Sequence, residues 1–307
     1  MNPYLNIDRI EFIVTDVCTG RYRHCSVGER VMHPRRAHVL PEDASRAVRE
    51  LAEIYRVQSV MTFGGEPLLY PDAVCAVHRT AAECGIPQRQ IITNGFFSRD
   101  ETRISEVARA LVRAGANDVL LSVDAFHQER IPMEPVQHFA RALLDAGLSR
   151  LRLSPAWVVN EAFDCPENTR TREVLAAFEA LGIPVHEGND IFLSGNAATQ
   201  LGHYYPPATL DRADCCGSMP YTEPLTAQTS LSIEPDGVVT VCGFVIGNVR
   251  RERMAEIVKR YDPHADEGMC AAMQGVPGLL ALAEKRGIEV DLARCRSVCD
   301  LCRSVNG

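Results

Sequence analysis

Apolar and polar residues follow a repeating order between residues 9 and 187. Short apolar runs rich in β-branched residues are each followed by a segment whose apolar positions recur with the period of a helix. Six such units of roughly 30 residues each are typical of parallel strands joined by right-handed helical crossovers, and they predict an α/β fold with a partial (β/α)6 barrel. The predicted strands are 9–15, 57–63, 89–94, 118–123, 150–158 and 183–188, and the clearest predicted helices are 41–56 and 103–117.

The pattern changes after about residue 190. Two β-prone runs within 231–242 flank Asp236 and Gly237, a pair typical of a hairpin turn, and the chain closes with the segment CRSVCDLC at 295–302. We therefore expect two parts, a partial barrel in residues 1–195 and a small cysteine-rich α+β domain in residues 196–307.

Composition narrows the class of protein. The chain has 307 residues, of which 46% are hydrophobic and 23% charged, and this balance indicates a globular protein. A net charge of -8 disfavours general nucleic-acid binding. No signal peptide is evident, and no apolar run approaches the roughly 18 residues of a membrane span, so we expect a cytoplasmic protein without a membrane partner. The basic stretch from Arg21 to Arg36 is either a solvated loop or a segment with carboxylate or phosphate partners.

The chain contains twelve cysteines, more than packing requires. A reducing compartment argues against disulfides, which leaves metal or iron-sulfur ligation as the leading interpretation. Three cysteines lie within eight residues at the C-terminal end, and a cysteine at the hairpin end together with Cys215 or Cys216 could complete a shell of thiolates for zinc or for an iron-sulfur cluster. The predicted ligands here are Cys216, Cys242, Cys295, Cys299 and Cys302; Cys75, Cys84, Cys165 and Cys270 lack ligand spacing.

Polar and glycine-rich motifs follow the first four predicted strands. In an α/β barrel these loops meet at one mouth, where the chemistry collects. The loop 17–28 carries Cys18 and Cys25, and GGEP at 64–67 allows close approach of a ligand to the backbone and offers a carboxylate to an ammonium group. TNG follows the third strand at 93–95, and S-x-D at 122–124 can bind hydroxyls. Each motif alone could be a tight turn, a polar strand end or a pair of unrelated cysteines. His127, Gln128 and Glu129 are either a substrate-facing acid or base, or the start of a helix.

Taken in order, these motifs resemble the radical S-adenosylmethionine (SAM) superfamily. The resemblance implies a [4Fe-4S] cluster held by three cysteines of the first loop, with the amino and carboxylate groups of SAM on the fourth iron. Cys18 and Cys25 match the first and third cluster cysteines. The residues implied to contact SAM are Gly64, Gly65, Glu66, Pro67 and Asn94, with Ser122 and Asp124 at the ribose.

Tyr22 stands where the family has its middle cysteine. Several interpretations stay open: Tyr22 is an iron ligand as a phenolate; the cluster forms on two thiolates and an outside ligand; no cluster forms; or the tyrosine is a recorded substitution of cysteine. A phenolate requires the metal to displace a proton from a group whose ordinary pKa is near 10.

The C-terminal cysteines are similar to those of the SPASM and twitch extensions of the same superfamily, which implies one auxiliary iron-sulfur cluster. We expect a radical SAM oxidoreductase that produces a 5′-deoxyadenosyl radical and modifies a peptide or protein side chain, with an electron donor such as a flavodoxin or ferredoxin. No separate leader-binding domain is expected before residue 9. The alternatives are a small-molecule dehydrogenase of the same superfamily, and a catalytically inactive iron-sulfur or zinc protein on the same scaffold.

Overall fold

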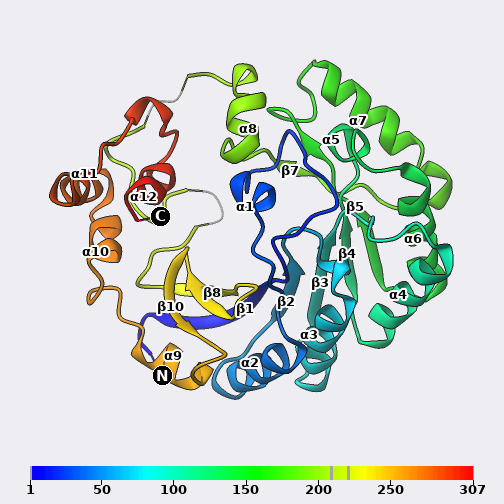
Figure 1. Cartoon of the computed structure of the whole chain (residues 1–307), viewed down its shortest axis with the longest axis horizontal. Coiled ribbons are helices and arrows are strands. Elements are labelled where there is room, and N and C mark those ends of the chain that lie inside the picture. The colour runs from blue at the N-terminus through cyan, green and yellow to red at the C-terminus, as the bar shows by residue number, and fades with distance from the viewer. Residues whose placement is uncertain (1, 208–209, 220–221, 307) are drawn as a thin grey trace.

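The computed structural model describes residues 2–207, 210–219 and 222–306, and its centre is a curved sheet of eight strands. The strand order is β10-β9-β8-β1-β2-β3-β4-β5. Figure 1 shows the sheet lining the inside of an open arch. The strands of its parallel part are β1 (Leu5–Ile13), β2 (Ser59–Phe63), β3 (Gln88–Thr93), β4 (Asp118–Leu121) and β5 (Arg150–Leu153).

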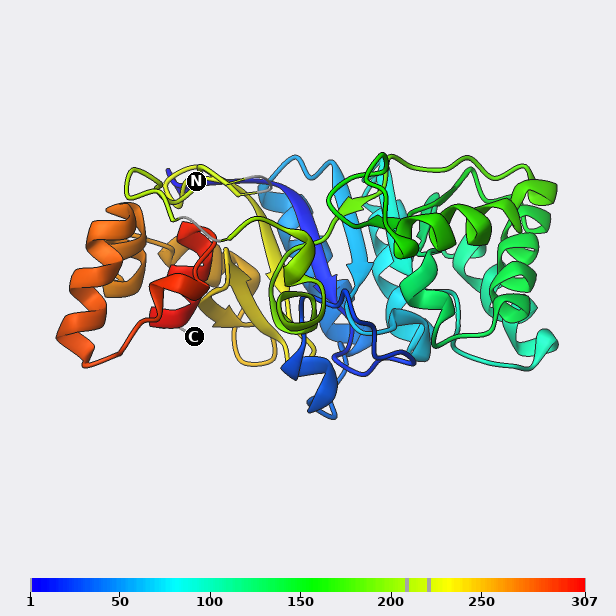
Figure 2. The same ribbon diagram turned by 90° about the horizontal axis from the view of Figure 1, so that it is seen from above.

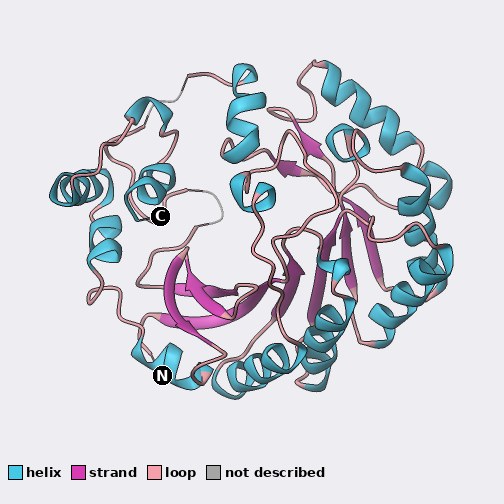
Figure 3. Cartoon of the chain, in the orientation of Figure 1, coloured by secondary structure: helices cyan, strands magenta, loops and turns pink. Residues whose placement is uncertain are grey.

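Strands β1 to β5 are parallel, each paired with the next. Their apolar side chains, such as Phe12, Val60 and Ile91, are fully buried, as expected for strands covered by helices. The covering helices lie outside the arch (Figure 3). They are α2 (Pro41–Ile54), α3 (Pro71–Glu83), α4 (Glu101–Arg113) and α6 (Met133–Asp145). The predicted α/β fold class and the predicted helices at 41–56 and 103–117 are confirmed.

The last two predicted strands differ from the structure. The run 150–158 is interrupted at Pro155 and forms two strands, β5 and β6 (Ala156–Trp157), because proline has no backbone N–H for a sheet. β6 pairs with β7 (Asn189–Asp190) in a separate two-stranded sheet. The predicted strand 183–188 is reduced to a single bridge between Leu153 and Val185.

The C-terminal part extends the same sheet. β8 (Gln228–Ile233) pairs in parallel with β1, so one sheet contains strands from both predicted parts of the chain. The predicted domain boundary at residue 195 stays a prediction. The hairpin at 231–242 is confirmed, with Gly237 at φ +84° in the turn to β9 (Val238–Val241). Figure 2 shows that the helices after the hairpin form one end of an elongated molecule. They are α10 (Glu267–Met273), α11 (Gly275–Arg286) and α12 (Val298–Asn306), preceded by β10 (Phe244–Asn248) and α9 (Met254–Arg260).

The short helices lie on loops around the arch. α1 (Glu29–Met32) and α8 (Gly195–Gln200) stand over its open side, and α5 (Ala125–Gln128) and α7 (Pro166–Ala176) lie near the ends of β4 and β6. Within the described residues, no helix combines the length and apolar character needed to cross a membrane.

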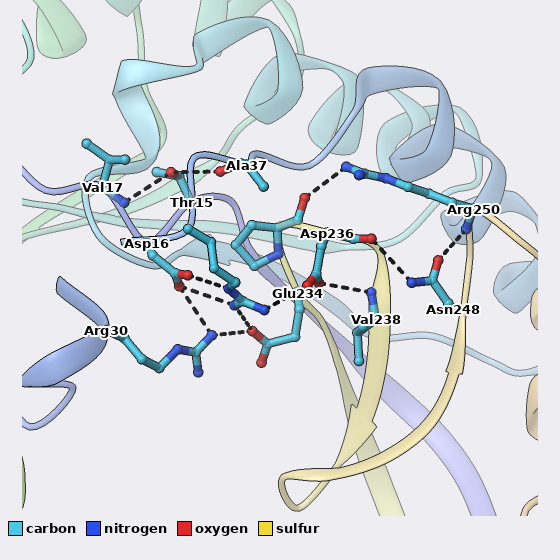
Figure 4. Close-up of polar contacts among 12 residues, drawn as sticks. Thr15, Asp16, Val17, Arg30, Ala37, Glu234, Asp236, Val238, Asn248 and Arg250 are labelled. Atoms are coloured by element: carbon cyan, nitrogen blue, oxygen red, sulfur yellow. Dashed lines mark hydrogen bonds and ion pairs between the residues drawn. The ribbon is translucent and has the colours of Figure 1, made fainter. Parts of the chain in front are cut away.

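Two arginines of the basic stretch tie the loop after β1 to the β8–β9 hairpin (Figure 4). Arg35 donates to Asp16 Oδ2 at 2.6 Å, to Glu234 Oε2 at 2.7 Å and to Asp236 Oδ2 at 2.9 Å. Arg30 also bonds Asp16, whose carboxylate is buried, and Glu234. The basic stretch was interpreted either as a solvated loop or as a segment with carboxylate or phosphate partners, and these two arginines have carboxylate partners. The network fixes the residue two positions before Cys18 to the C-terminal part of the sheet.

Candidate functional site

The carboxyl ends of the parallel strands surround a cavity of about 450 Å³. This volume is in the range of sites for small molecules and cofactors. Its walls come from the loops after β1 to β4, closed by residues around β6 and β7. Of the residues predicted from the sequence, those that line it are Cys18, Tyr22, Cys25, Gly64, Gly65, Asn94, Ser122 and Asp124.

Gly64 and Gly65 bring the β2 loop against the loop after β1. The backbone N–H of Gly65 donates to Thr15 O at 2.7 Å, and that of Glu66 donates to Val17 O at 2.8 Å. Gly64 has a φ of +137°, and a Cβ atom added to Gly65 would lie 2.1 Å from Val17 O. Only glycine permits this contact, which leaves backbone at the cavity wall.

Gly65→Ala is therefore expected to push the two loops apart. A clash with backbone atoms costs roughly 1–3 kcal/mol in the free energy of unfolding, to be measured by urea denaturation. Gly202→Ala is the matched control, because a Cβ atom there meets no atom within 4 Å and φ lies outside the left-handed region. Equal stability of the two variants would show that the close approach at Gly65 is dispensable.

The carboxylate of Glu66 is buried behind the cavity wall. It accepts hydrogen bonds from Leu68 N at 2.9 Å, from Thr93 Oγ1 at 2.6 Å and from Asn94 N at 2.9 Å. Burial raises its pKa to about 7, although these hydrogen bonds oppose the shift. Glu66 thus links the GGEP turn to the end of β3, and its oxygens are engaged by protein donors in the place where an ammonium partner was expected. Pro67 is likewise buried, at the start of a single 3-10 turn.

The raised pKa of Glu66 predicts a pH dependence of stability. The folded state holds the proton more tightly than the unfolded state, whose pKa is near 4.5. The free energy of unfolding should therefore fall as pH rises from about 4.5 to about 7, by on the order of 3 kcal/mol, and this contribution should be level above pH 7. Urea denaturation across this range should show the fall in the wild type and in the exposed control Glu101→Gln, but not in Glu66→Gln. An unchanged slope in Glu66→Gln would contradict the assignment.

Tyr22 fills part of the loop that carries the two cysteines. Its side chain is buried, and its Oη accepts a hydrogen bond from Asn94 Nδ2 at 2.8 Å. The ring lies so close to Gly20 that a Cβ atom there would be 2.1 Å from it, and its centroid is 4.3 Å from that of the His127 ring. Burial, followed by the negative charges of Cys18 and Glu66, raises the pKa of Tyr22 above its ordinary range. The phenol is therefore neutral.

Cys18 and Cys25 are half-buried thiols on either side of Tyr22. Burial raises the pKa of Cys18 to about 11, while a hydrogen bond from Gly20 N opposes the shift. Cys25 is fixed through its backbone, with its N–H donating to Tyr22 O at 3.3 Å and its carbonyl accepting from Asn196 N at 3.0 Å. Two thiols and a phenol, each a possible iron ligand, thus converge on one cavity.

Asp124 is a helix cap as well as a cavity residue. Its Oδ1 accepts from His127 N at 3.0 Å, and its Oδ2 contacts His127 Nδ1 at 2.8 Å and accepts from Ala156 N at 3.0 Å. Burial would raise the pKa of Asp124, but the charge and hydrogen bonds of His127 outweigh it and lower the pKa to about 2. The helix start lies at Asp124, whereas His127 and Gln128 end α5 and Glu129 is its C-cap; His127 also lines the cavity. Both carboxylate oxygens are engaged, so Ser122 is the freer of the two predicted ribose contacts.

Four C-terminal thiols form a second group. Cys216 and Cys242 interact directly: the hydrogen bond between them lowers the pKa of Cys216 and raises that of Cys242. Cys299 and Cys302 lie within electrostatic range of Cys242. Burial, with the charges of these neighbours adding, raises the pKa of Cys299 to about 11. These four are predicted ligands that the fold brings together.

The backbone at Cys242 is strained. Cys242 and Gly243 form a two-residue turn between β9 and β10, with φ of +49° and +84°. Glycine and asparagine are the usual residues of such a turn, and a non-glycine residue in this conformation costs on the order of 1–3 kcal/mol. A strained cysteine that joins three other thiols is typical of a ligand site.

Cys295, also a predicted ligand, lies apart from this group. Its side chain is buried in the core, its Sγ contacts Asp291 O at 3.6 Å, and the charged groups that influence it are Asp300 and Asp291 rather than other thiols. Cys295 lies just before α12, whereas Cys299 and Cys302 lie on that helix, three residues apart and on one face. The close spacing in the sequence suggested one group of three cysteines, but only Cys299 and Cys302 lie on the same face of α12.

Several polar residues of the cavity were not predicted as site residues, His24 and Thr93 among them. His24 lines it, and burial lowers the pKa of His24 to about 4. Thr93 is buried against Glu66 and helps to bind its carboxylate. His24 stands next to Cys25 inside the motif, a position that could have marked it, whereas the role of Thr93 depends on the packing of β3 against the GGEP turn.

The fold and the cavity define an α/β protein with a ligand site at the carboxyl ends of parallel strands. Residues 12–155 match the family model described as the Radical SAM superfamily. This part of the chain therefore resembles a radical SAM superfamily domain, and proteins of that superfamily bind a [4Fe-4S] cluster and SAM.

Relatives agree with this class. The GTP 3',8-cyclase of Lactiplantibacillus plantarum is 32% identical over 123 residues, 40% of this chain and 35% of that protein. The GTP 3',8-cyclase of Moorella thermoacetica is 29% identical over 161 residues, 48% of this chain and 46% of that protein. The chain thus spans less than half the length of these relatives. A solved structure of histidine-tagged anSMEcpe with bound AdoMet has the same fold, with a TM-score of 0.51 at 13% identity over 86% of this chain and 79% of that one.

Proposed function

We propose that the protein is a radical SAM enzyme with a SPASM- or twitch-like C-terminal part and one auxiliary iron-sulfur cluster. The observation that carries the proposal is the cavity where Cys18, Tyr22 and Cys25 meet the Gly64–Gly65 backbone at the ends of parallel strands. This is the arrangement that a radical SAM domain needs, with metal ligands on one wall and backbone open to a polar cofactor on the other.

The SAM side of the cavity fits its cofactor. Backbone at Gly64 and Gly65 is free of side chains, and Ser122 offers a hydroxyl to a ribose. Asn94 joins the end of β3 to the cysteine loop, because its Nδ2 donates to Thr19 Oγ1 at 3.1 Å as well as to Tyr22 Oη.

The cluster side fits with one altered donor. Cys18 and Cys25 supply two thiolates, and Tyr22 supplies a phenol oxygen between them. For Tyr22 to bind, iron would have to displace the phenol proton, and burial opposes this by raising the pKa of Tyr22, although the hydrogen bond from Asn94 favours the phenolate; this makes the third position the weak one. The reduced cluster, when bound, supplies the electron that cleaves SAM into methionine and a 5′-deoxyadenosyl radical for hydrogen abstraction from a substrate. The residues of the chain hold and orient these groups and exclude water.

The auxiliary cluster is proposed at Cys216, Cys242, Cys299 and Cys302. A single zinc ion with four thiolates needs sulfur atoms under about 4 Å apart, given Zn–S bonds of ≈ 2.3 Å. Among the described residues, three or more ligand atoms within 4.8 Å of one another occur at residues 24, 124 and 127, and not at these thiols. The wider spacing of the four thiols favours an iron-sulfur cluster.

A peptide or protein side chain is the proposed substrate. Val27 and Phe192 line the cavity and are exposed to 44% and 54%, so its rim offers apolar side chains to an extended partner. A small-molecule substrate is the second candidate, and the similarity to GTP 3',8-cyclases favours it. An electron donor of the flavodoxin or ferredoxin type is proposed in both cases.

Anaerobic reconstitution with iron and sulfide tests the cofactor assignment. We expect about eight iron atoms per chain, and about four in a Cys18→Ser/Cys25→Ser variant that keeps only the C-terminal site. Cys84→Ser, which replaces an exposed cysteine outside both groups, is the control. An iron content that Cys18→Ser/Cys25→Ser leaves unchanged would exclude a cluster in the cavity. Adding GTP to the reconstituted protein and measuring 5′-deoxyadenosine separates the two substrate classes, because stimulation would favour the small molecule.

A further inference from the structure

One group of side chains in the cavity has the composition of a site for a single metal ion. His24 comes from the loop after β1, and Asp124 and His127 come from the start of α5 after β4. Their donor atoms all lie within 4.8 Å of one another. Two imidazoles and one carboxylate on one side of an open cavity are the ligand set of many iron(II) sites.

The Asp124–His127 pair already has the geometry of two neighbouring ligands. Asp124 Oδ2 and His127 Nδ1 are 2.8 Å apart. Two donors on adjacent positions of a metal ion, each at about 2.1 Å, lie about 3 Å apart. An ion bound to both atoms would lie to one side of the line that joins them, so the His127 ring would have to turn toward it while the hydrogen between the atoms moves to the other ring nitrogen.

His24 supplies an independent indication of a ligand. Its Nδ1 is buried and has no hydrogen-bond partner within the described chain. A buried polar atom without a partner is rare and calls for an unseen ion, water or ligand. The His24 ring lies 4.8 Å from the His127 ring, centroid to centroid.

We propose that His24, Asp124 and His127 bind a single divalent transition-metal ion such as Fe²⁺ or Zn²⁺. The remaining coordination positions face the cavity and are open to water or to a ligand. Since Asp124 and His24 also line the space assigned to SAM, the ion and SAM are expected to compete. The site goes beyond the proposed function, and neither the cluster nor SAM cleavage is needed for it.

Cobalt(II) is the probe for this site in the 307-residue chain purified without iron. Cobalt on nitrogen and oxygen donors gives weak visible bands, whereas thiolate donors add an intense near-ultraviolet band, so the spectrum separates this site from the cysteines. We expect one cobalt with the weak bands, separate from any cobalt that the thiol groups bind with the near-ultraviolet band, and at least a tenfold loss of affinity for the weak-band ion in His24→Gln and in His127→Gln. His138→Gln is the matched control, because His138 bonds only Ser105 on the outer helices.

SAM added to the cobalt-loaded protein should displace the ion and abolish the weak bands. The proposal is overturned if His24→Gln and His127→Gln bind cobalt as the wild type does, or if every cobalt band is of the thiolate type. Circular dichroism checks folding, and His24→Gln, a change on a loop, decides the matter if His127→Gln does not fold. These readouts are independent of 5′-deoxyadenosine formation, so the site and the proposed enzyme activity can fail separately.

Discussion

Tyr22→Cys is expected to raise the rate of SAM cleavage at least tenfold over the wild type. The substitution replaces a buried neutral phenol, whose pKa burial has raised, with a thiol that iron deprotonates more readily. It also removes a ring that lies against Gly20 and His127, and so opens space for the cluster. The measurement is 5′-deoxyadenosine formed per cluster under reducing conditions.

Tyr22→Phe is the matched control for this result. It keeps the ring and its packing but removes the oxygen that accepts from Asn94, and with it the third donor of the cluster loop. We expect loss of SAM cleavage and weaker retention of iron in the cavity. If Tyr22→Phe cleaves SAM as fast as the wild type, Tyr22 is not a ligand and the cluster forms on two thiolates with an outside group.

Cys299→Ser/Cys302→Ser has the second large expected effect, the loss of about half of the bound iron. Both cysteines lie on one face of α12 and interact electrostatically with Cys216, so the double variant removes half of the proposed ligands. Loss of the cluster should also destabilise the C-terminal end, because metal binding contributes directly to folding in small metal-binding units. Iron and sulfide analysis and thermal unfolding measure the two effects.

Cys295→Ser is the control that distinguishes the four-thiol assignment from the assignment based on sequence spacing, which includes Cys295. Cys295 lies in the same CRSVCDLC segment, but its sulfur is directed to Asp291 O, so the variant should keep its full iron content. Iron lost equally from Cys295→Ser would contradict the four-thiol assignment. Zinc in place of iron at the native site would contradict the auxiliary cluster itself.

The periodic apolar pattern was sufficient to predict the parallel part of the sheet, because fully buried strands and amphipathic helices differ clearly in period. It could not show that β8 pairs with β1, since a parallel contact between segments more than 200 residues apart leaves no local signal. Loop order likewise predicted that Cys18, Gly65 and Ser122 meet at one mouth, as they do.

The roles of individual side chains were harder to predict. Glu66 and Asp124 were expected to face SAM, yet both are mostly engaged by buried protein donors whose positions depend on tertiary packing. The difference between Cys295 and Cys299 depends on where α12 begins, which three closely spaced cysteines do not reveal. His24 became visible as a possible ligand only when the fold placed it beside His127.

The most direct test of the account is the formation of 5′-deoxyadenosine from SAM by the wild-type protein, after anaerobic reconstitution and reduction with dithionite. We predict that it forms at a measurable rate, that Cys18→Ser/Cys25→Ser abolishes it and that Cys84→Ser leaves it unchanged. No 5′-deoxyadenosine from the wild type, with ready formation by Tyr22→Cys, would contradict the proposed enzyme activity and show a radical SAM scaffold that Tyr22 has deprived of its reaction.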